Sequence, residues 1–163
     1  MASNHVGWLD IVFLGTAMRL RSVHFMAKQE LFKSAFTRWL LKTLNAFPVN
    51  RAKPGPSSLK IPLSLLRKEE IVGIFPSGTR SQESISLKKG AVTMAQIVDV
   101  PVVPAFYKGP STISWKYLFK REKIRILIGN PLVETDQTKS SDEKRDSLLS
   151  KLQLSLFDLE KEL

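Results

Sequence analysis

At its centre the chain reads Ile71-Val72-Gly73-Ile74-Phe75-Pro76-Ser77-Gly78-Thr79-Arg80. Its first five residues are apolar, which is typical of a short buried strand, and the Pro-Ser-Gly that follows is typical of a turn. Helical spacing of apolar residues precedes this stretch, at 59–69, and helical composition follows it, at 90–98. A buried strand between two helices is the repeating unit of an α/β sheet, so this stretch indicates the fold class.

The same alternation extends along the rest of the chain. Other apolar runs bounded by turn residues predict strands at 23–26, 47–49, 102–107 and 123–128. Further helices are predicted at 29–45, basic and amphipathic, and at 141–163, charged, while Ser57 or Ser58 can cap the helix at 59–69. We therefore expect one domain over residues 1–163, an α/β fold with a central, mostly parallel sheet flanked by helices. Ligands of such sheets gather at the carboxyl ends of the strands.

The composition of the chain limits the kinds of partner and of chemical site that it can have. The chain has 25 Lys plus Arg against 15 Asp plus Glu, and its net charge of +10 favours nucleic acid, phosphorylated metabolites, an acidic carrier protein or anionic lipid. Cysteine is absent, which excludes disulfides, thiolate metal sites and a cysteine nucleophile. The longest apolar stretch, 11–17, is far shorter than the roughly 20 residues that span a bilayer, so membrane contact of this chain is expected to be peripheral.

One of the two histidines has a carboxylate at a suggestive spacing. His5 is separated by four residues from Asp10, and if Asp10 lies in the first turn of a helix, its carboxylate can fold back to one imidazole nitrogen. That is the base and orienting half of a catalytic triad. The spacing alone equally fits a frayed His5 and an Asp10 that only caps the helix. His24, on the strand predicted at 23–26, has no nearby carboxylate and is expected to be structural.

A second group of residues suits a phosphate. Gly78 allows backbone N–H groups to approach an anion, and Thr79, Arg80 and Ser81 add donors. Taken alone, the segment also fits an ordinary turn with a solvated arginine. Two further cations follow or precede predicted elements: Arg51 comes after the strand at 47–49, and Lys88 comes before the helix at 90–98.

Together these motifs resemble those of a known enzyme family. Asn4-His5, four residues and Asp10 are followed in order by Val49-Asn50-Arg51, then by Phe75-Pro76-Ser77-Gly78-Thr79-Arg80, then by Val100-Pro101-Val102-Val103-Pro104. This order and spacing resemble the four motifs of the glycerolipid acyltransferases. The resemblance extends to about Pro131 and is greatest to the bacterial 1-acyl-sn-glycerol-3-phosphate (lysophosphatidic acid) acyltransferases.

The resemblance assigns roles to individual residues. It implies that His5 and Asp10 are the catalytic pair, that Arg51, Thr79 and Arg80 contact the phosphate and glycerol of the substrate, and that Lys88 is a further phosphate-binding lysine. Pro101 and Pro104 are expected to shape the acyl-binding wall. Ser77 departs from the pattern, because most of the family has glutamate there, which accepts a hydrogen bond from a glycerol hydroxyl more strongly than serine does.

The resemblance also implies a reaction and its partners. The acyl group of an acyl carrier protein or coenzyme A thioester passes to the sn-2 hydroxyl of lysophosphatidic acid, which gives phosphatidic acid in phospholipid biosynthesis, with no metal and no resident cofactor. The expected location is the cytoplasmic face of the cell membrane. Because relatives place membrane-binding helical segments before the histidine motif, we expect that this chain lacks such an upstream segment.

Two segments have the aromatic and basic makeup of a membrane interface. They are the amphipathic helix at 29–45 and the segment that holds Trp115, Tyr117 and Phe119 among Lys116, Lys120 and Arg121. The apolar face of the helix can instead pack on the sheet.

Two other functions stay open at this point. Acylation of glycerol 3-phosphate or of another lysophospholipid would use the same motifs. A non-catalytic module that binds anions or nucleic acid fits the charge and the interleaved aromatic residues, but leaves the histidine motif unexplained.

Overall fold

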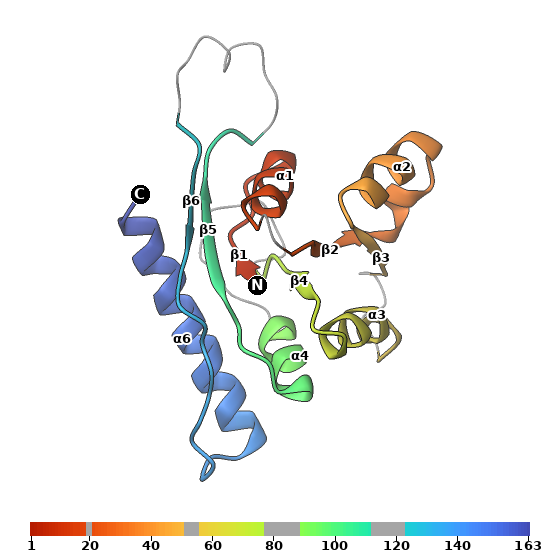
Figure 1. Ribbon diagram of the computed structural model, residues 1–163. Coiled ribbons are helices and arrows are strands. Elements are labelled where there is room, and N and C mark those ends of the chain that lie inside the picture. The colour runs from red at the N-terminus through yellow and green to blue at the C-terminus, as the bar shows by residue number, and fades with distance from the viewer. Residues whose placement is uncertain (19–20, 51–55, 77–88, 112–122) are drawn as a thin grey trace.

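The structure is a computed structural model that describes residues 1–18, 21–50, 56–76, 89–111 and 123–163 (Figure 1). Its strands are β1 (Ala2–Ser3), β2 (Val23–Lys28), β3 (Phe47–Val49), β4 (Ile71–Gly73), β5 (Pro104–Lys108) and β6 (Arg125–Ile128). Its helices are α1 (Trp8–Ala17), the 3-10 helix η1 (Gln29–Phe32), α2 (Ala35–Thr43), α3 (Pro56–Arg67), α4 (Gly90–Val98) and α6 (Ser141–Lys161).

The shortest strand joins two halves of the sheet. Strands β3, β2 and β4 pair in parallel in that order, and β1, β5 and β6 form the other half. Ala2 also forms a parallel bridge with Ile74, just after β4, and the Ser3 N–H donates to the Ile74 carbonyl at 3.0 Å. The order across the sheet is therefore β3-β2-β4-β1-β5-β6, with β6 antiparallel to β5. The predicted α/β fold with a mostly parallel sheet is confirmed.

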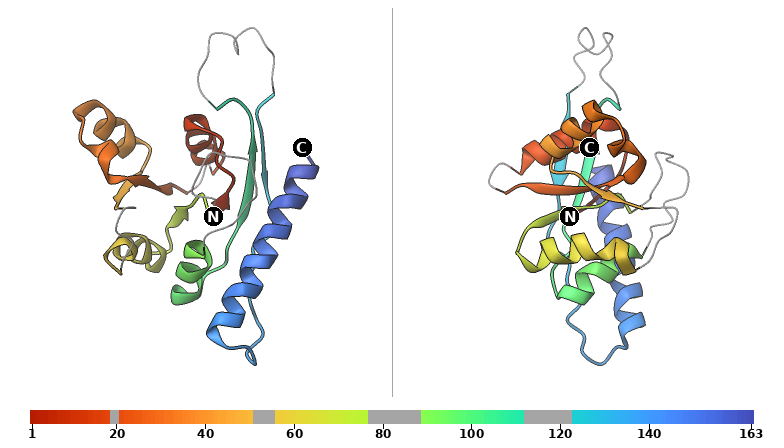
Figure 2. Two further views of the ribbon diagram at one scale, coloured as in Figure 1. Left: turned by 180° about the vertical axis from the view of Figure 1, so that it is seen from behind. Right: turned by 90° about the vertical axis from the view of Figure 1, so that its right-hand side faces the viewer.

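Helices cover both faces of this sheet. Helices α1 and α2 lie on one side of β2 and β4, and α3 and α4 lie on the other, with α6 alongside β5 (Figure 2). One buried cluster joins Leu14 of α1 to Phe25 and Ala105, and a second joins Ala2 and Val102 to residues of α4 and α6. Burial of apolar side chains on both faces stabilises a parallel sheet, which explains why β3 and β4 are continuous apolar runs.

Most predicted elements are present, with shifted ends. Helix α4 has the predicted bounds, and the strand at 47–49 is β3. The predicted cap at Ser57 or Ser58 is wrong, because α3 already begins at Pro56 and both serines lie inside it. Proline is favoured in the first turn of a helix, where its missing N–H would have no partner. Strand β1 was not predicted, because two residues carry no periodicity.

The helix predicted at 29–45 is divided into η1 and α2. Ser34 lies between them in an extended conformation at the N-cap of α2. Of the side chains of α2, Leu41 alone is classed as buried, so the helix has little contact with the sheet. Over the parts of the chain that the structure describes, no helix has both the length and the apolarity to cross a bilayer.

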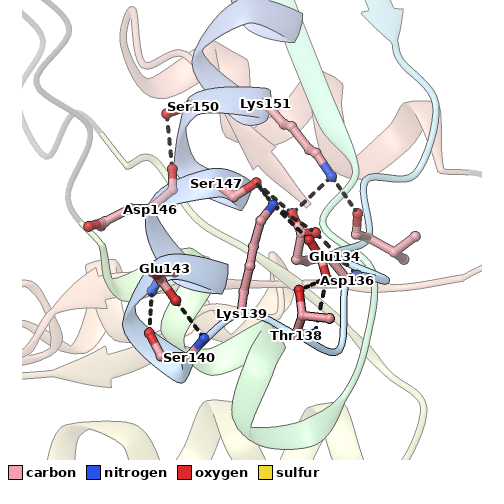
Figure 3. Close-up of polar contacts among 11 residues, drawn as sticks. Glu134, Asp136, Thr138, Lys139, Ser140, Glu143, Asp146, Ser147, Ser150 and Lys151 are labelled. Carbon is pink, nitrogen blue, oxygen red and sulfur yellow. Dashed lines mark hydrogen bonds and ion pairs between the residues drawn. The ribbon is translucent and has the colours of Figure 1, made fainter.

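A cluster of charged residues fastens the end of the chain to the sheet. Glu134 follows β6, and its carboxylate accepts hydrogen bonds from Ser147 at 2.6 Å and Lys151 at 2.9 Å on α6, and from Lys139 at 3.4 Å (Figure 3). Its side chain is 7% exposed. The hydrogen bonds from Ser147 and Lys151 lower the pKa of Glu134 to about 2. The cluster therefore holds α6 against the chain that leaves β6.

This pKa predicts acid sensitivity of the fold. A carboxyl group whose pKa is lower in the folded than in the unfolded chain adds stability above its unfolded value, here near 4.5. That contribution disappears as the pH falls toward 2. In urea unfolding at pH 7 and pH 3, Glu134→Gln should lower the stability at pH 7 and lose less stability on acidification than the parent. Glu160→Gln, which changes an exposed carboxyl group on α6, is the control and should keep the parent's full acid loss.

Candidate active site

The site is built on the turn that leaves the central strand. Chain direction is the same in β1, β2 and β4, so their carboxyl ends lie at one edge of the sheet. Residues Asn4 to Gly7 leave β1 at this edge, and α1 begins at Trp8 with Asp10 in its first turn. This is the edge at which ligands of parallel sheets bind. His5 and Asp10 are thus placed at the functional edge of the fold.

The carboxylate of Asp10 organises the turn. Its Oδ2 lies 2.9 Å from His5 Nδ1 and accepts hydrogen bonds from the N–H groups of Val6, at 2.7 Å, and Gly7, at 2.9 Å. The side chain is fully buried, and Oδ1 has no hydrogen-bond partner among the described residues. Asp10 therefore both caps α1 and holds the imidazole, so the two alternatives that the spacing left open for Asp10 are true together.

His5 is held from a second direction by an aromatic ring. Its imidazole stacks on Phe75, with ring centroids 4.3 Å apart and 24° between the planes, and Phe75 in turn stacks on Phe25 at 5.8 Å. The His5 side chain is 15% exposed. A side chain held by a buried carboxylate and a buried ring is not frayed. Because Nδ1 faces an oxygen that can only accept, Nδ1 carries the proton and Nε2 is the nitrogen available as a base.

Asn4 fixes the turn to the neighbouring strand. Its side-chain amide donates to the Tyr107 carbonyl at 2.9 Å and accepts from the Tyr107 N–H at 2.8 Å. The amide group thus replaces the next backbone pair of the β1–β5 ladder, which ends at Ser3 and Ala105. The backbone is then free to turn away from the sheet, and the next residue is His5. Asn4 belongs to the motif quoted from the sequence, but nothing in the spacing of that motif predicted its hydrogen bonds to Tyr107.

Gly7 lies against the backbone that follows β5. A Cβ atom at this position would lie 2.6 Å from the carbonyl carbon of Ser111, and closer still to its oxygen. Gly7 has an extended backbone, so the requirement for glycine comes from space and not from conformation. The Tyr107 hydroxyl donates to the Pro110 carbonyl at 2.9 Å, which fixes the backbone that Gly7 contacts. The chain that follows β5 therefore supports the turn that carries His5.

We expect Asn4 to act on turnover through His5. Asn4→Ala removes both hydrogen bonds to Tyr107, and a base displaced by about 1 Å can cost on the order of 10²-fold in rate. The variant should have a lower kcat with a KM close to that of the parent in a steady-state assay of the acyl transfer that the sequence resemblance implies. Asn130→Ala, which changes an exposed asparagine after β6, should have the parent's kcat. An Asn4→Ala protein that unfolds more easily but keeps the parent's kcat would contradict the positioning role.

The other site residues predicted from the sequence lie outside the described residues. These are Arg51, Ser77, Gly78, Thr79, Arg80 and Lys88, and the aromatic and basic segment at 115–121 is also outside. The described chain nevertheless leads to them from the functional edge. Asn50 follows the carboxyl end of β3, and Phe75 and Pro76 follow β4 beside His5. Their roles stay predictions.

His24 lies at the other end of the strands. It is the second residue of β2 and pairs with Val72, and its Nε2 is 3.7 Å from a carboxylate oxygen of Glu70, which precedes β4. The expectation that His24 lacks a carboxylate neighbour was wrong, because strand pairing brings Glu70 to it across 46 residues of sequence. Glu70 is 45% exposed, and a pair this exposed contributes little to stability.

A cavity of about 480 Å³ opens on the α1 and α2 side of the sheet. Its walls include Ile11, Met18, Val23 and Leu44, with Arg21 at the same site. Neither His5 nor Asp10 lines it. It is therefore separate from the edge that carries His5.

Comparison with known proteins shows the family of this chain. The sequence profile of the Acyltransferase family matches residues 1–108. The chain is 51% identical to the 1-acyl-sn-glycerol-3-phosphate acyltransferase of Bacillus subtilis over 136 residues, which are 83% of this chain and 67% of that protein. It is 32% identical to the enzyme of the same name from Streptococcus pneumoniae, over 99% of this chain and 60% of that protein.

A solved structure is also similar. The crystal structure of the 1-acyl-sn-glycerophosphate acyltransferase PlsC from Thermotoga maritima superposes with a TM-score of 0.66 at 26% identity, over 98% of this chain and 65% of that one. The chain thus spans about two thirds of the length of the relatives it matches. With a family profile over most of its length and a histidine–aspartate pair at the functional edge of its sheet, this chain belongs to the acyltransferase family.

Proposed function

We propose that the protein transfers a fatty acyl group from an acyl thioester to the sn-2 hydroxyl of lysophosphatidic acid and forms phosphatidic acid. The observation that carries the proposal is the contact of His5 Nδ1 with Asp10 Oδ2 at 2.9 Å, on a turn fixed by Asp10 and Asn4. The names of the Bacillus subtilis and Streptococcus pneumoniae relatives support this acceptor.

The reaction requires one base and no covalent intermediate. Nε2 of His5 takes the proton of the acceptor hydroxyl as its oxygen attacks the thioester carbonyl carbon. The new ester C–O bond forms, the C–S bond breaks, and the proton passes from the imidazolium to the departing sulfur. Asp10 keeps the proton on Nδ1 in the resting enzyme and stabilises the imidazolium while it exists.

The phosphate of the acceptor needs positive charge near this base. Arg51, Thr79, Arg80 and Lys88 are proposed to bind it, with Ser77 and Gly78 in the same turn. Phe75, which stacks on His5, precedes Ser77 by two residues, and this connection supports the proposal. Arginine suits the task because its planar guanidinium donates two parallel hydrogen bonds to phosphate oxygens.

The donor and the location are part of the proposal. Acyl carrier protein and coenzyme A are both anionic, and a chain with a net charge of +10 attracts either of them. The same charge favours an anionic membrane surface, and we propose peripheral association with the cytoplasmic face of the cell membrane.

One assay tests the proposal. The chain is given a labelled acyl thioester, either acyl carrier protein or coenzyme A bound, with lysophosphatidic acid, glycerol 3-phosphate or lysophosphatidylcholine as the acceptor. We expect labelled phosphatidic acid with the first acceptor. Product with glycerol 3-phosphate alone would change the acceptor, whereas no ester with any acceptor, together with salt-sensitive nucleic-acid binding, would refute acyl transfer.

A further inference from the structure

Helix α2 exposes two large aromatic side chains next to each other. Phe36 is 68% exposed and Trp39 is 64% exposed, and their ring centroids are 6.3 Å apart. They lie three residues apart on a helix whose Leu41 alone is buried. Exposed tryptophan and phenylalanine on one helix face mark an interaction surface more often than a solvated one.

The charge around these rings is positive. Lys28, Lys33, Arg38 and Lys42 are exposed, and Glu30 is the one acidic residue in the sequence between 28 and 43. Four cations and one carboxylate give the segment a net charge of +3. Arg38 donates a hydrogen bond from Nε to the Phe32 carbonyl of η1 at 2.9 Å, whereas the side chains of Lys33 and Lys42 are exposed. Aromatic residues with lysine at their flanks are the composition of helices that lie in a membrane interface.

The position of α2 in the fold also suits contact with a membrane surface. Strand β2 is parallel to β4, which is parallel to β1, so η1 and α2 follow the same edge of the sheet from which His5 projects. Helices α1 and α2 lie on the same side of β2 (Figure 2). A flat partner that touches α2 would therefore lie on the α1 side of the sheet, toward the edge from which His5 projects.

We propose that Phe36 and Trp39, flanked by Lys33 and Lys42, dock α2 on an anionic phospholipid bilayer. The two rings enter the interface and the lysines pair with lipid phosphates. The inference deepens the proposed function, on which its link to catalysis rests, but docking itself can be measured without turnover.

The test is sedimentation with vesicles in the absence of substrate. Vesicles of equal parts phosphatidylglycerol and phosphatidylcholine should bind the chain more tightly than vesicles of phosphatidylcholine alone. Phe36→Ala/Trp39→Ala should weaken binding to the anionic vesicles by at least about tenfold, because the apolar area of two aromatic rings leaves the interface. Lys33→Gln/Lys42→Gln should weaken it by about fivefold for each charge removed, and less at high salt.

Two matched control variants test whether vesicle binding depends on this surface or on any exposed apolar or charged side chains. Leu154 and Phe157 on α6 are 64% and 50% exposed and also lie three residues apart, so Leu154→Ala/Phe157→Ala removes a similar apolar pair elsewhere. Lys60→Gln/Lys68→Gln removes two exposed charges at α3, on the opposite side of the sheet. Leu154→Ala/Phe157→Ala should bind the anionic vesicles like the parent, and Lys60→Gln/Lys68→Gln should lose less binding than Lys33→Gln/Lys42→Gln.

A second measurement distinguishes docking from chemistry. Phe36→Ala/Trp39→Ala should lose turnover on vesicle-borne lysophosphatidic acid by the factor seen in binding, but keep the parent's turnover on a short-chain acceptor dissolved as monomers. If neither protein has turnover, the proposed function fails while the binding result still stands. Equal vesicle binding by the parent and the aromatic variant would overturn the docking proposal, as would a change from dimer to monomer in sedimentation velocity with vesicle binding unaltered.

Discussion

His5→Ala is expected to lower kcat by at least 10²–10⁴-fold, the usual contribution of a general base. The lost transition-state stabilisation is about 3–5 kcal/mol. The KM for lysophosphatidic acid should change little, because the proposed phosphate contacts do not involve the imidazole. Asp10 keeps its hydrogen bonds from Val6 and Gly7 in the variant, so the turn is expected to remain folded. Steady-state formation of labelled phosphatidic acid measures the effect.

The second histidine provides the control. His24→Ala changes an imidazole that is 23% exposed, at the opposite end of the strands, and should leave kcat within about twofold of the parent because it lies away from the edge that carries His5. A kcat for His5→Ala within tenfold of the parent, at an equal thermal midpoint, would exclude His5 as the base. A loss of the same size in both variants would point to a general effect of removing imidazole groups.

Asp10→Asn is expected to lower kcat by about 10³–10⁴-fold, on the scale seen when a triad carboxylate becomes an amide. Three donors converge on Asp10 Oδ2, and an amide offers one oxygen in place of the carboxylate. The imidazole can then adopt the wrong tautomer, and the imidazolium loses the charge that stabilises it. Because Asp10 also caps α1, the free energy of unfolding should fall by about 1 kcal/mol.

A carboxylate with the same capping geometry separates the two effects. Glu143 stands at the third position of α6, where it accepts a hydrogen bond from the Ser140 N–H at 2.7 Å, as Asp10 does from Gly7. Glu143→Gln should weaken this helix start and leave kcat unchanged. If Asp10→Asn lost stability alone, with turnover like that of the parent, Asp10 would be a helix cap and not a positioning residue for the base.

The local sequence was enough to predict those elements of the fold that depend on short-range patterns of residues. Helix α4 and strand β3 had the predicted bounds, because each is a compact apolar segment between turn residues. The contact of His5 with Asp10 was one of two alternatives that the spacing left open, and the structure shows that it is formed. The basic helix at 29–45 was expected either to pack on the sheet or to lie on a membrane, and its exposed aromatic pair could not be read from its periodicity.

By itself, then, the sequence determined the α/β class and the order of the motifs, and it limited His5 and Asp10 to two alternatives. These depend on periodicity and on contacts between residues a few positions apart. Tertiary structure alone decided that β1 is the central strand, that Asn4 is held by Tyr107 103 residues away, and that His24 faces Glu70. Such pairings depend on which strands become neighbours, and strand order is set by the packing of all the helices on the sheet and not by any local pattern.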